Sequence, residues 1–269
     1  MKKKIQLSDK TNHFLRFVPN LLTICNSLCG FLAIIYTLQV YKMSPQTDDL
    51  RGVFCVSSIM IFSAMIFDAF DGLAARALNA ASLHGIQMDS LADMVTFGVA
   101  PATIVVIMTD TLKAGVMANW QVALVYLMCS VYIGCAALRL ATYNVHAMSA
   151  EKKGDPSYFS GMPSPGAAAA ICAVVFFAHE TKLPVEKFAF VLPVYAAILG
   201  LLMVSTIPYI HAGRWLFSVR KSKRRMLMLA LMILVAVVFR TAGIVFMITT
   251  YVLSGPFIQL FRTIRRKDA

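Results

Sequence analysis

The sequence has few charged residues and contains long stretches with none. Of its 269 residues, 14% are charged and 59% are hydrophobic, and the mean hydropathy is +0.72. A soluble domain has about 25% charged and about 45–50% apolar residues. The scarcity of charge excludes an ordinary water-soluble globule, and the abundance of apolar residues excludes a disordered chain. The composition therefore indicates a chain that crosses a lipid bilayer several times.

Paired cysteines and acidic residues are also scarce. The six cysteines lie within apolar stretches, none forms a CxxC pair, and no histidine lies at zinc-ligand spacing from them. This excludes a disulfide-stapled scaffold and a zinc site built on those thiols. Only 13 acidic residues oppose 25 lysines and arginines, which gives a formal net charge of +12. Because the basic residues lie between apolar stretches, without interleaved aromatic residues, they suit anionic lipid headgroups and not nucleic acid.

Eight stretches without charge predict the membrane spans. A transmembrane helix needs about 20 mostly apolar residues. The stretches are 17–41, 52–67, 94–109, 114–138, 156–179, 188–213, 226–239 and 241–261. The seventh spans a bilayer only if Arg240 reaches an interface or the helix continues past it. We therefore predict an all-α integral membrane protein of about eight transmembrane helices, in which a six-helix unit is followed by a C-terminal helical hairpin.

Charged segments divide the chain and predict its orientation. The predicted units are a basic N-terminal segment (1–16), a six-helix membrane domain (17–213), a basic linker that contacts anionic lipid (214–225), the terminal hairpin (226–261) and a basic tail (262–269). The first apolar stretch is too long for a signal-peptide core, and no small-residue cleavage site follows it. With both termini in the cytoplasm, most lysines and arginines fall on the cytoplasmic side, as the positive-inside rule requires. The absence of a transit peptide favours a bacterial inner membrane.

Four aspartates surround the turn between the second and third predicted helices. Asp68 and Asp71 are three residues apart, and Asp89 and Asp93 are four apart, so each pair lies on one helix face. A short loop over residues 77–84 lets the two helices run antiparallel, which brings the four carboxylates to one depth. Such carboxylates repel one another at low dielectric, so cations must neutralise them or some must be protonated. Oxygen-only ligands suit Mg²⁺, Mn²⁺ or Ca²⁺.

The neighbours of these aspartates suit a diphosphate. Gly72 allows close backbone approach beside Asp71, and Arg76, one turn further on, offers a planar fork of N–H donors for phosphate. Phosphoryl transfer requires mainly positioning and charge stabilisation, and a carboxylate can remove the proton of an attacking hydroxyl. No cysteine or histidine nucleophile is needed, so we predict direct transfer between two bound substrates. The simpler interpretation, solvated acids at an interfacial turn, suits one aspartate better than four.

The same segment resembles the signature of a known family. It reads Asp68-x2-Asp71-Gly72-x2-Ala75-Arg76-x8-Gly85-x3-Asp89-x3-Asp93, and all eight fixed positions match the CDP-alcohol phosphotransferases. The resemblance implies a six-helix membrane core, usually a homodimer, with a site open to the cytoplasm. It also implies that a CDP-linked alcohol gives up its phosphoryl group to an acceptor hydroxyl, and that CMP leaves.

The resemblance further implies a role for each signature residue. Asp68, Asp71 and Asp89 would bind a pair of divalent ions, Mg²⁺ or Mn²⁺. Asp93 would act as the general base and would also reach the second ion. The remaining fixed positions would line the cytidine and diphosphate site: Gly72, Ala75, Arg76 and Gly85. The two C-terminal spans would lie outside the shared unit.

Further blocks resemble one subgroup of this family, the membrane-integral bacterial phosphatidylserine synthases. The blocks are 18–23 with 25–31, then 89–101, 138–145 and 158–165, and together they cover roughly residues 16–166 in order. This resemblance implies that CDP-diacylglycerol is the donor and L-serine the acceptor, with phosphatidylserine and CMP as products.

Several substrate contacts are expected outside the signature. Arg139, at the inner end of the fourth helix, is expected to pair with the serine carboxylate, the alternative being a positive-inside anchor, and Asn144 to orient the acceptor. Asn20 is expected to contact CDP-diacylglycerol. Together with Thr23 and Asn26 it forms a polar stripe that either faces the nucleotide or joins helices by hydrogen bonds.

Two other functions are open at this point. The first keeps the chemistry and changes the acceptor to glycerol 3-phosphate or inositol phosphate, which would call for several basic residues around the pocket, where Arg139 is nearly alone. The second is a divalent-cation transporter with the four aspartates as its transport site. Transport sites usually lie near the bilayer midplane on broken helices, in internally repeated folds, and the sequence has no matching halves.

Overall fold

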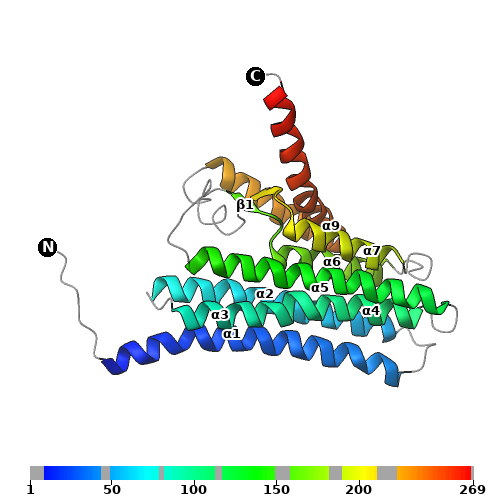
Figure 1. The fold of residues 1–269 in the computed structure, drawn as a ribbon, viewed down its shortest axis with the longest axis horizontal. Helices are drawn as coiled ribbons and strands as arrows, with labels where there is room; N and C mark the ends of the chain where they lie inside the picture. Colours follow the sequence, from blue (N-terminus) through cyan, green and yellow to red (C-terminus); the bar gives the residue numbers. More distant parts are fainter. Residues whose placement is uncertain are drawn as a thin grey trace.

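Long helices aligned side by side make up most of the protein. The computed structural model describes residues 9–43, 49–78, 82–112, 117–148, 158–181, 190–210 and 223–267. The long elements are α1 (Asp9–Leu38), continued by the short 3₁₀ helix η1 (Gln39–Lys42), α2 (Asp49–Ala77), α3 (Leu83–Asp93), the π-helical segment η2 (Met94–Val99), α4 (Ala100–Leu112) and α5 (Asn119–Met148). Figure 1 shows these helices running parallel to the long axis of the molecule.

Two shorter helices and a small ribbon complete the bundle. The shorter helices are α6 (Ser164–Glu180) and α7 (Val191–Val204). The strands β1 (Tyr158–Ser160) and β2 (Pro208–Ile210) pair antiparallel, with Phe159 opposite Tyr209. The ribbon thereby ties the segment before α6 to the segment after α7. Gly161 follows β1 with φ of +80°, a conformation that favours glycine, and its N–H donates to the carbonyl of Ile207 over 2.9 Å.

The helices are long and apolar enough to confirm an all-α integral membrane protein. Five of them qualify by length and composition as membrane spans: Phe17–Lys42, Leu50–Ala77, Leu83–Leu112, Asn119–Val145 and Val238–Arg262. With the shorter apolar helices α6 and α7, the first four correspond to the predicted six-helix unit. The second and third spans extend well beyond the uncharged stretches 52–67 and 94–109, because the helices continue through the aspartates.

One face of α1 carries a repeating set of small and polar residues against the bundle. Along α1 and into η1, the buried positions recur at alternating intervals of four and three residues: Pro19, Thr23, Asn26, Gly30, Ala33, Thr37 and Val40. The other faces carry large exposed apolar side chains such as Leu28 and Phe31. Small and hydroxyl side chains at helix contacts are typical of membrane proteins, where they permit close approach and interhelical hydrogen bonds. The seam therefore directs the polar side of α1 toward α2 and η2 and its apolar side outward.

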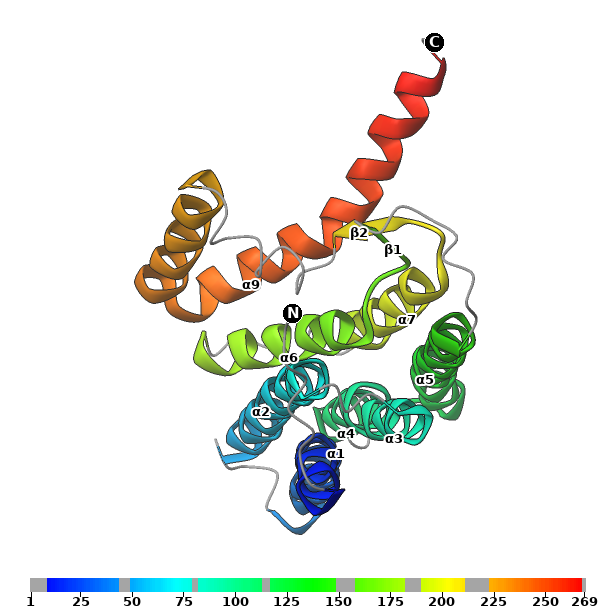
Figure 2. The same ribbon diagram turned by 90° about the vertical axis from the view of Figure 1, so that its left-hand side faces the viewer.

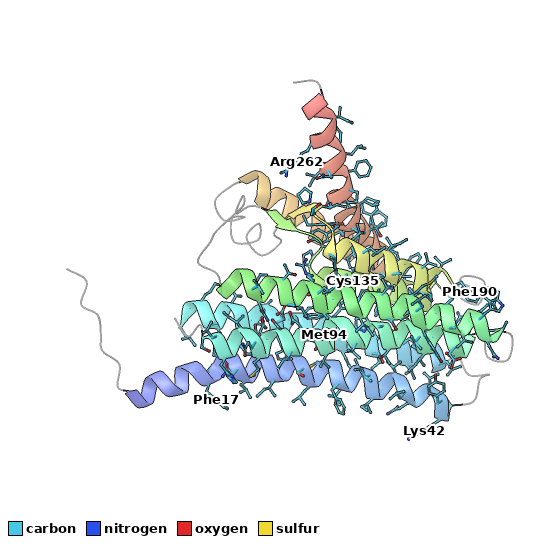
Figure 3. The ribbon with its side chains drawn as sticks, in the orientation of Figure 1. Phe17, Lys42, Met94, Cys135, Phe190 and Arg262 are labelled. Atoms are coloured by element: carbon cyan, nitrogen blue, oxygen red, sulfur yellow. The ribbon has the colours of Figure 1, made fainter. Side chains whose placement is uncertain are left out.

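The third span is one continuous helix with a π-helical segment in its middle. Met94, within η2, lies near the centre of the bundle (Figure 3). Two contacts hold η2: the hydroxyl of Tyr132, a fully buried residue of α5, donates to the carbonyl of Phe97 over 2.7 Å, and the hydroxyl of Thr96 donates to the carbonyl of Asn26 over 3.1 Å. Gly30 of α1 lies so close that a Cβ there would overlap Thr96. Segments of π-helix occur often at functional sites.

The C-terminal helix differs in direction from the bundle. α9 (Lys223–Lys267) has a non-helical backbone at Arg240, with φ of 48° and ψ of −125°, which divides it into two arms. The break falls between the two stretches that predict the terminal hairpin. In Figure 2, which looks along the bundle, α1 and α3 to α5 are seen nearly end on, whereas the second arm of α9 is seen lengthwise. Its far end, with Arg262, projects from the bundle (Figure 3).

Some predicted segments fall partly outside the described residues. These are residues 1–8 of the basic N-terminal segment, residues 214–222 of the basic linker and residues 268–269 of the tail.

Candidate active site

The aspartates lie where α2 ends and α3 begins, at the end of the bundle where α1 starts (Figure 1). Asp68 and Asp71 occupy the last turns of α2. α3 begins after Ser82, whose hydroxyl accepts the N–H of Gly85 over 3.0 Å and so caps the helix. Because this cap fixes the residue at which α3 begins, it also fixes the face of α3 on which Asp89 and Asp93 lie. The predicted antiparallel hairpin is thus present.

Three of the four carboxylates converge. Asp68, Asp71 and Asp89 each offer an oxygen, and these three oxygens lie within 4.8 Å of one another. The Oδ1 atom of Asp89 is buried without a hydrogen-bond partner. A buried carboxylate oxygen without a partner is costly, and a divalent cation among three carboxylates would supply one. The donor set is oxygen only, so the residues fit Mg²⁺ or Mn²⁺.

Helix α1 holds the other oxygens of the site. The hydroxyl of Thr23 donates to Asp71 Oδ2 over 2.9 Å, and the amide of Asn26 donates to Asp93 Oδ1 over 3.1 Å. Asn26 is fully buried and Asp93 is 7% exposed. Of the two interpretations of the polar stripe on α1, Thr23 and Asn26 therefore satisfy the one in which the stripe joins helices by hydrogen bonds, and their partners are the signature aspartates themselves.

The predicted nucleotide-site residues surround the same hairpin. Asn20 faces α3, since its Oδ1 would lie 3.8 Å from a Cβ placed on Gly85. Across the hairpin, the nearest atom to a Cβ on Gly72 would be Nη2 of Arg76, also at 3.8 Å. Arg76 is exposed at the end of α2, and Ala75 beside it is half-buried. These residues therefore border an accessible region beside the carboxylates.

Arg139 approaches the site from α5. Its Nη1 lies 3.5 Å from the carbonyl oxygen of Met203, in the last turn of α7. Asp93, Tyr143 and Tyr251 lie close enough to the guanidinium to interact with its charge. The structure thus brings Arg139 together with the predicted base, although the two residues come from different helices.

Asn144 lies one turn beyond Arg139 in a groove between α3 and α5. Its Oδ1 accepts the hydroxyl of Ser90, the neighbour of Asp89, over 2.8 Å. The groove has a volume of about 360 Å³, and its lining residues are Gln87, Ser90 and Leu91 of α3, Met94 of η2, and Ala137, Leu140, Ala141 and Asn144 of α5. Asn144 is therefore tied to α3 beside the carboxylate cluster.

Sequence reasoning missed two residues near the site. Tyr132 bonds to the π-helical segment through a contact between residues far apart in the sequence, and no sequence pattern predicts it. Tyr251 belongs to the terminal hairpin, which the signature does not include. For Asn26, the three-residue spacing from Thr23 was a usable signal, because it places both side chains on the buried face of α1.

A known protein family matches most of the chain. The sequence profile of the CDP-alcohol phosphatidyltransferases matches residues 16–256. The chain belongs to the CDP-alcohol phosphatidyltransferase family. As a member, it is a membrane-embedded transferase of phospholipid synthesis. The matched residues extend into the second arm of α9, so most of the terminal hairpin falls within the range of the family profile.

Individual relatives of this CDP-alcohol phosphatidyltransferase carry related names. A CDP-diacylglycerol–serine O-phosphatidyltransferase of Bacillus subtilis is 32% identical over 212 residues, which cover 75% of this chain and 99% of the relative. The protein of that name from Saccharomyces cerevisiae is 31% identical over 180 residues, 64% of this chain and 60% of the relative. An archaetidylserine synthase of Methanothermobacter thermautotrophicus is 26% identical over 210 residues, 76% of this chain and 73% of the relative.

Proposed function

We propose that the enzyme transfers the phosphatidyl group of CDP-diacylglycerol to the hydroxyl of L-serine, giving phosphatidylserine and CMP. The observation that carries the transfer chemistry is the convergence of the Asp68, Asp71 and Asp89 carboxylates beside Asp93. Membership of the family supports a CDP-linked donor. Relatives that are named as serine phosphatidyltransferases support serine as the acceptor.

The cluster is proposed to hold two divalent ions, Mg²⁺ or Mn²⁺. Asp68, Asp71 and Asp89 would be their ligands, and Asp93 would reach the second ion. When bound, such ions neutralise the diphosphate and stabilise the attacking and leaving oxygens of an in-line displacement. In this proposal Thr23 orients Asp71 through its 2.9 Å hydrogen bond and leaves the other oxygen of that carboxylate for the ion.

The remaining residues are proposed to bind and orient the two substrates. Arg76, with its exposed guanidinium, would hold the diphosphate beside Gly72, Ala75 and Gly85, and Asn20 would contact the nucleotide. Arg139 would pair with the serine carboxylate, and Asn144 would orient the acceptor.

In the proposed displacement, the serine oxygen forms a bond to the phosphorus that carries diacylglycerol, while the bond from that phosphorus to the oxygen of CMP breaks. Asp93 accepts the proton of the serine hydroxyl, and the hydrogen bond from Asn26 holds the carboxylate in the direction of the acceptor. CMP leaves with the electrons of the broken bond. No covalent phosphoryl-enzyme is required, since both substrates are bound together.

The setting of the enzyme is also part of the proposal. We place it in a bacterial inner membrane with the aspartate end and both termini in the cytoplasm, because basic residues cluster in the segments that this orientation puts there. A homodimer is expected from the family, and the basic linker 214–225 is expected to contact anionic lipid.

The test is an acceptor panel on detergent-purified protein. CDP-diacylglycerol with Mn²⁺ or Mg²⁺ is offered with L-serine, glycerol 3-phosphate, inositol phosphate or inositol in separate reactions, and CMP release is measured. We expect release with serine alone, and its loss in Asp93→Asn. Release with a different acceptor would overturn the serine assignment and keep the transfer chemistry. Silence with all acceptors from a folded, metal-binding protein would overturn both, and metal uptake into proteoliposomes would then indicate transport.

A further inference from the structure

The second arm of α9 is seated on the bundle through two tyrosines. The ring of Tyr251 packs against that of Tyr209, the middle residue of β2, with centroids 5.8 Å apart and planes inclined by 52°. The hydroxyl of Tyr209 donates to the carbonyl of Val252 over 3.0 Å, and Tyr209 is fully buried. The arm is therefore joined to the β1–β2 ribbon by both a ring contact and a hydrogen bond.

Two glycines allow the second arm of α9 to pack closely against the bundle. In α6, a Cβ on Gly166 would lie 3.1 Å from the Tyr251 ring, and in α9 a Cβ on Gly255 would overlap the ring of Tyr209. The first glycine lets Tyr251 lie directly on the start of α6, and the second lets Tyr209 lie against the arm. The direction of the Tyr251 side chain is thus fixed by helix α6 on one side and by Tyr209 on the other.

Arg139 belongs to the same junction. Its Nη1 donates to the carbonyl of Met203 over 3.5 Å, at the last turn of α7 and close to the β1–β2 ribbon. Tyr251 from the C-terminal arm and Asp93 from the core both lie within electrostatic reach of the guanidinium. A guanidinium attracted to Asp93 alone would pair with the proposed base. The group of Tyr251 that lies within reach of the guanidinium is its phenol oxygen, which is an acceptor for a guanidinium N–H.

We infer that Tyr251 is a positioning residue for Arg139, so that the C-terminal arm helps to select the acceptor. The inference rests on the proposed function, in which Arg139 binds the serine carboxylate. Tyr251 touches neither substrate in this arrangement. It keeps the guanidinium directed to the acceptor carboxylate and away from Asp93, and the seat made by Gly166 and Tyr209 keeps Tyr251 in place.

The test compares Tyr251→Phe and Tyr251→Leu with the matched variant Tyr195→Phe, whose tyrosine lies in α7. Steady-state rates of CMP release give the KM for serine and for CDP-diacylglycerol, and inhibition by ethanolamine, which is serine without its carboxylate, reports acceptor selectivity. We expect the KM for serine to rise about 3- to 10-fold in Tyr251→Phe, which loses the phenol oxygen, and further in Tyr251→Leu, which also loses the ring. The KM for CDP-diacylglycerol should stay within about twofold, and the preference for serine over ethanolamine should fall.

Every other outcome of this experiment contradicts either the inference about Tyr251 or the proposed function. A Tyr251→Phe enzyme with an unchanged KM for serine and unchanged selectivity, in a wild type that uses serine, overturns the inference alone. Equal shifts in both KM values, or the same shift in Tyr195→Phe, indicate a purely structural effect and overturn it as well. A wild type that releases no CMP with serine overturns the proposed function itself. If Tyr251→Leu fails to fold, Tyr251→Phe still decides the question.

Discussion

The carboxylates at the two ends of the bundle have different surroundings. At the end opposite the aspartate cluster, Asp110 of α4 accepts the hydroxyl of Tyr41 over 2.9 Å, and Glu180 at the end of α6 accepts the hydroxyl of Thr241 in α9. Each of these carboxylates joins two elements through one hydroxyl. Asp110 is half-buried and Glu180 is exposed, so water remains available to both.

At the aspartate end, four carboxylates gather and part of their hydrogen-bonding capacity is left unused. Asp71 and Asp93 are held by α1, whereas Asp89 Oδ1 is buried without a partner. Like charges so close together destabilise one another. The comparison teaches that acidic residues link helices where they are dispersed, and that where they are crowded the fold bears a cost that a bound cation or protonation of a carboxyl group would offset.

The largest effect that separates the two ends is expected from removing the proposed base. Asp93→Asn should lower the rate of CMP release about 100- to 10,000-fold, the range attributed to a general base. Asp110→Asn is the matched control at the opposite end and should keep the rate within about twofold. Equal losses in the two variants would mean that the aspartate end has no special catalytic role.

The next effect concerns metal binding and stability. In the wild type, Mn²⁺ at a hundredfold excess over its Kd should stabilise the fold by about 2.7 kcal/mol, and Asp89→Asn should lose this response. The metal-free variant should melt above the metal-free wild type, since a crowded charge is replaced by an amide that can donate to its neighbours. Thermal unfolding with and without chelator measures both. A metal-free variant that melts lower would contradict the proposed crowding.

A smaller effect is expected from the hydroxyl that holds Asp71. Thr23→Val should lower kcat about tenfold, because a hydrogen bond to a charged group contributes about 1.5–3 kcal/mol. Thr37→Val is the matched control on the same seam of α1, where the lost bond goes to Ser57 over 2.8 Å. It should keep kcat and reduce stability by about 0.6 kcal/mol. A loss of kcat in Thr37→Val equal to that in Thr23→Val would show that the seam acts only through packing.

The smallest effect is expected at the opposite end. Tyr41→Phe removes the hydroxyl that Asp110 accepts, in an exposed position where such contacts contribute about 1 kcal/mol or less. Activity should be unchanged and the unfolding midpoint slightly lowered, which thermal unfolding alongside CMP release would measure. A clear loss of activity would show that the two ends are coupled.

The sequence alone predicts much of the fold and of the cluster. Uncharged stretches identify the six-helix unit, and the break at Arg240 falls where the hairpin turns. The spacings of Asp68 with Asp71 and of Asp89 with Asp93 predict that they converge, because a helix places residues three or four apart on one face. The uncharged stretches end the second span too early, before Asp68, and begin the third too late, after Asp93, because the absence of charge does not distinguish a solvated carboxylate from a buried one.

Other features depend on tertiary contacts and have no local signature. The π-helical segment forms where Gly30 lets α1 approach Thr96 and where Tyr132 reaches Phe97, and each of these contacts joins residues far apart in the sequence. The direction of the second arm of α9 depends on Tyr209 and Gly166. An apolar stretch of its length predicts a span, but it carries no information on the angle at which the helix crosses its neighbours.

The π-helical segment also fixes the angular phase of the aspartates. Each residue advances an α-helix by about 100°, so deleting one residue from Met94–Val99 would turn α3 by about that angle relative to α4. Asp89 and Asp93 would then face away from α1, although no residue of the site had been replaced. The length of this segment is therefore as much a part of the proposed catalytic apparatus as the identity of the carboxylates.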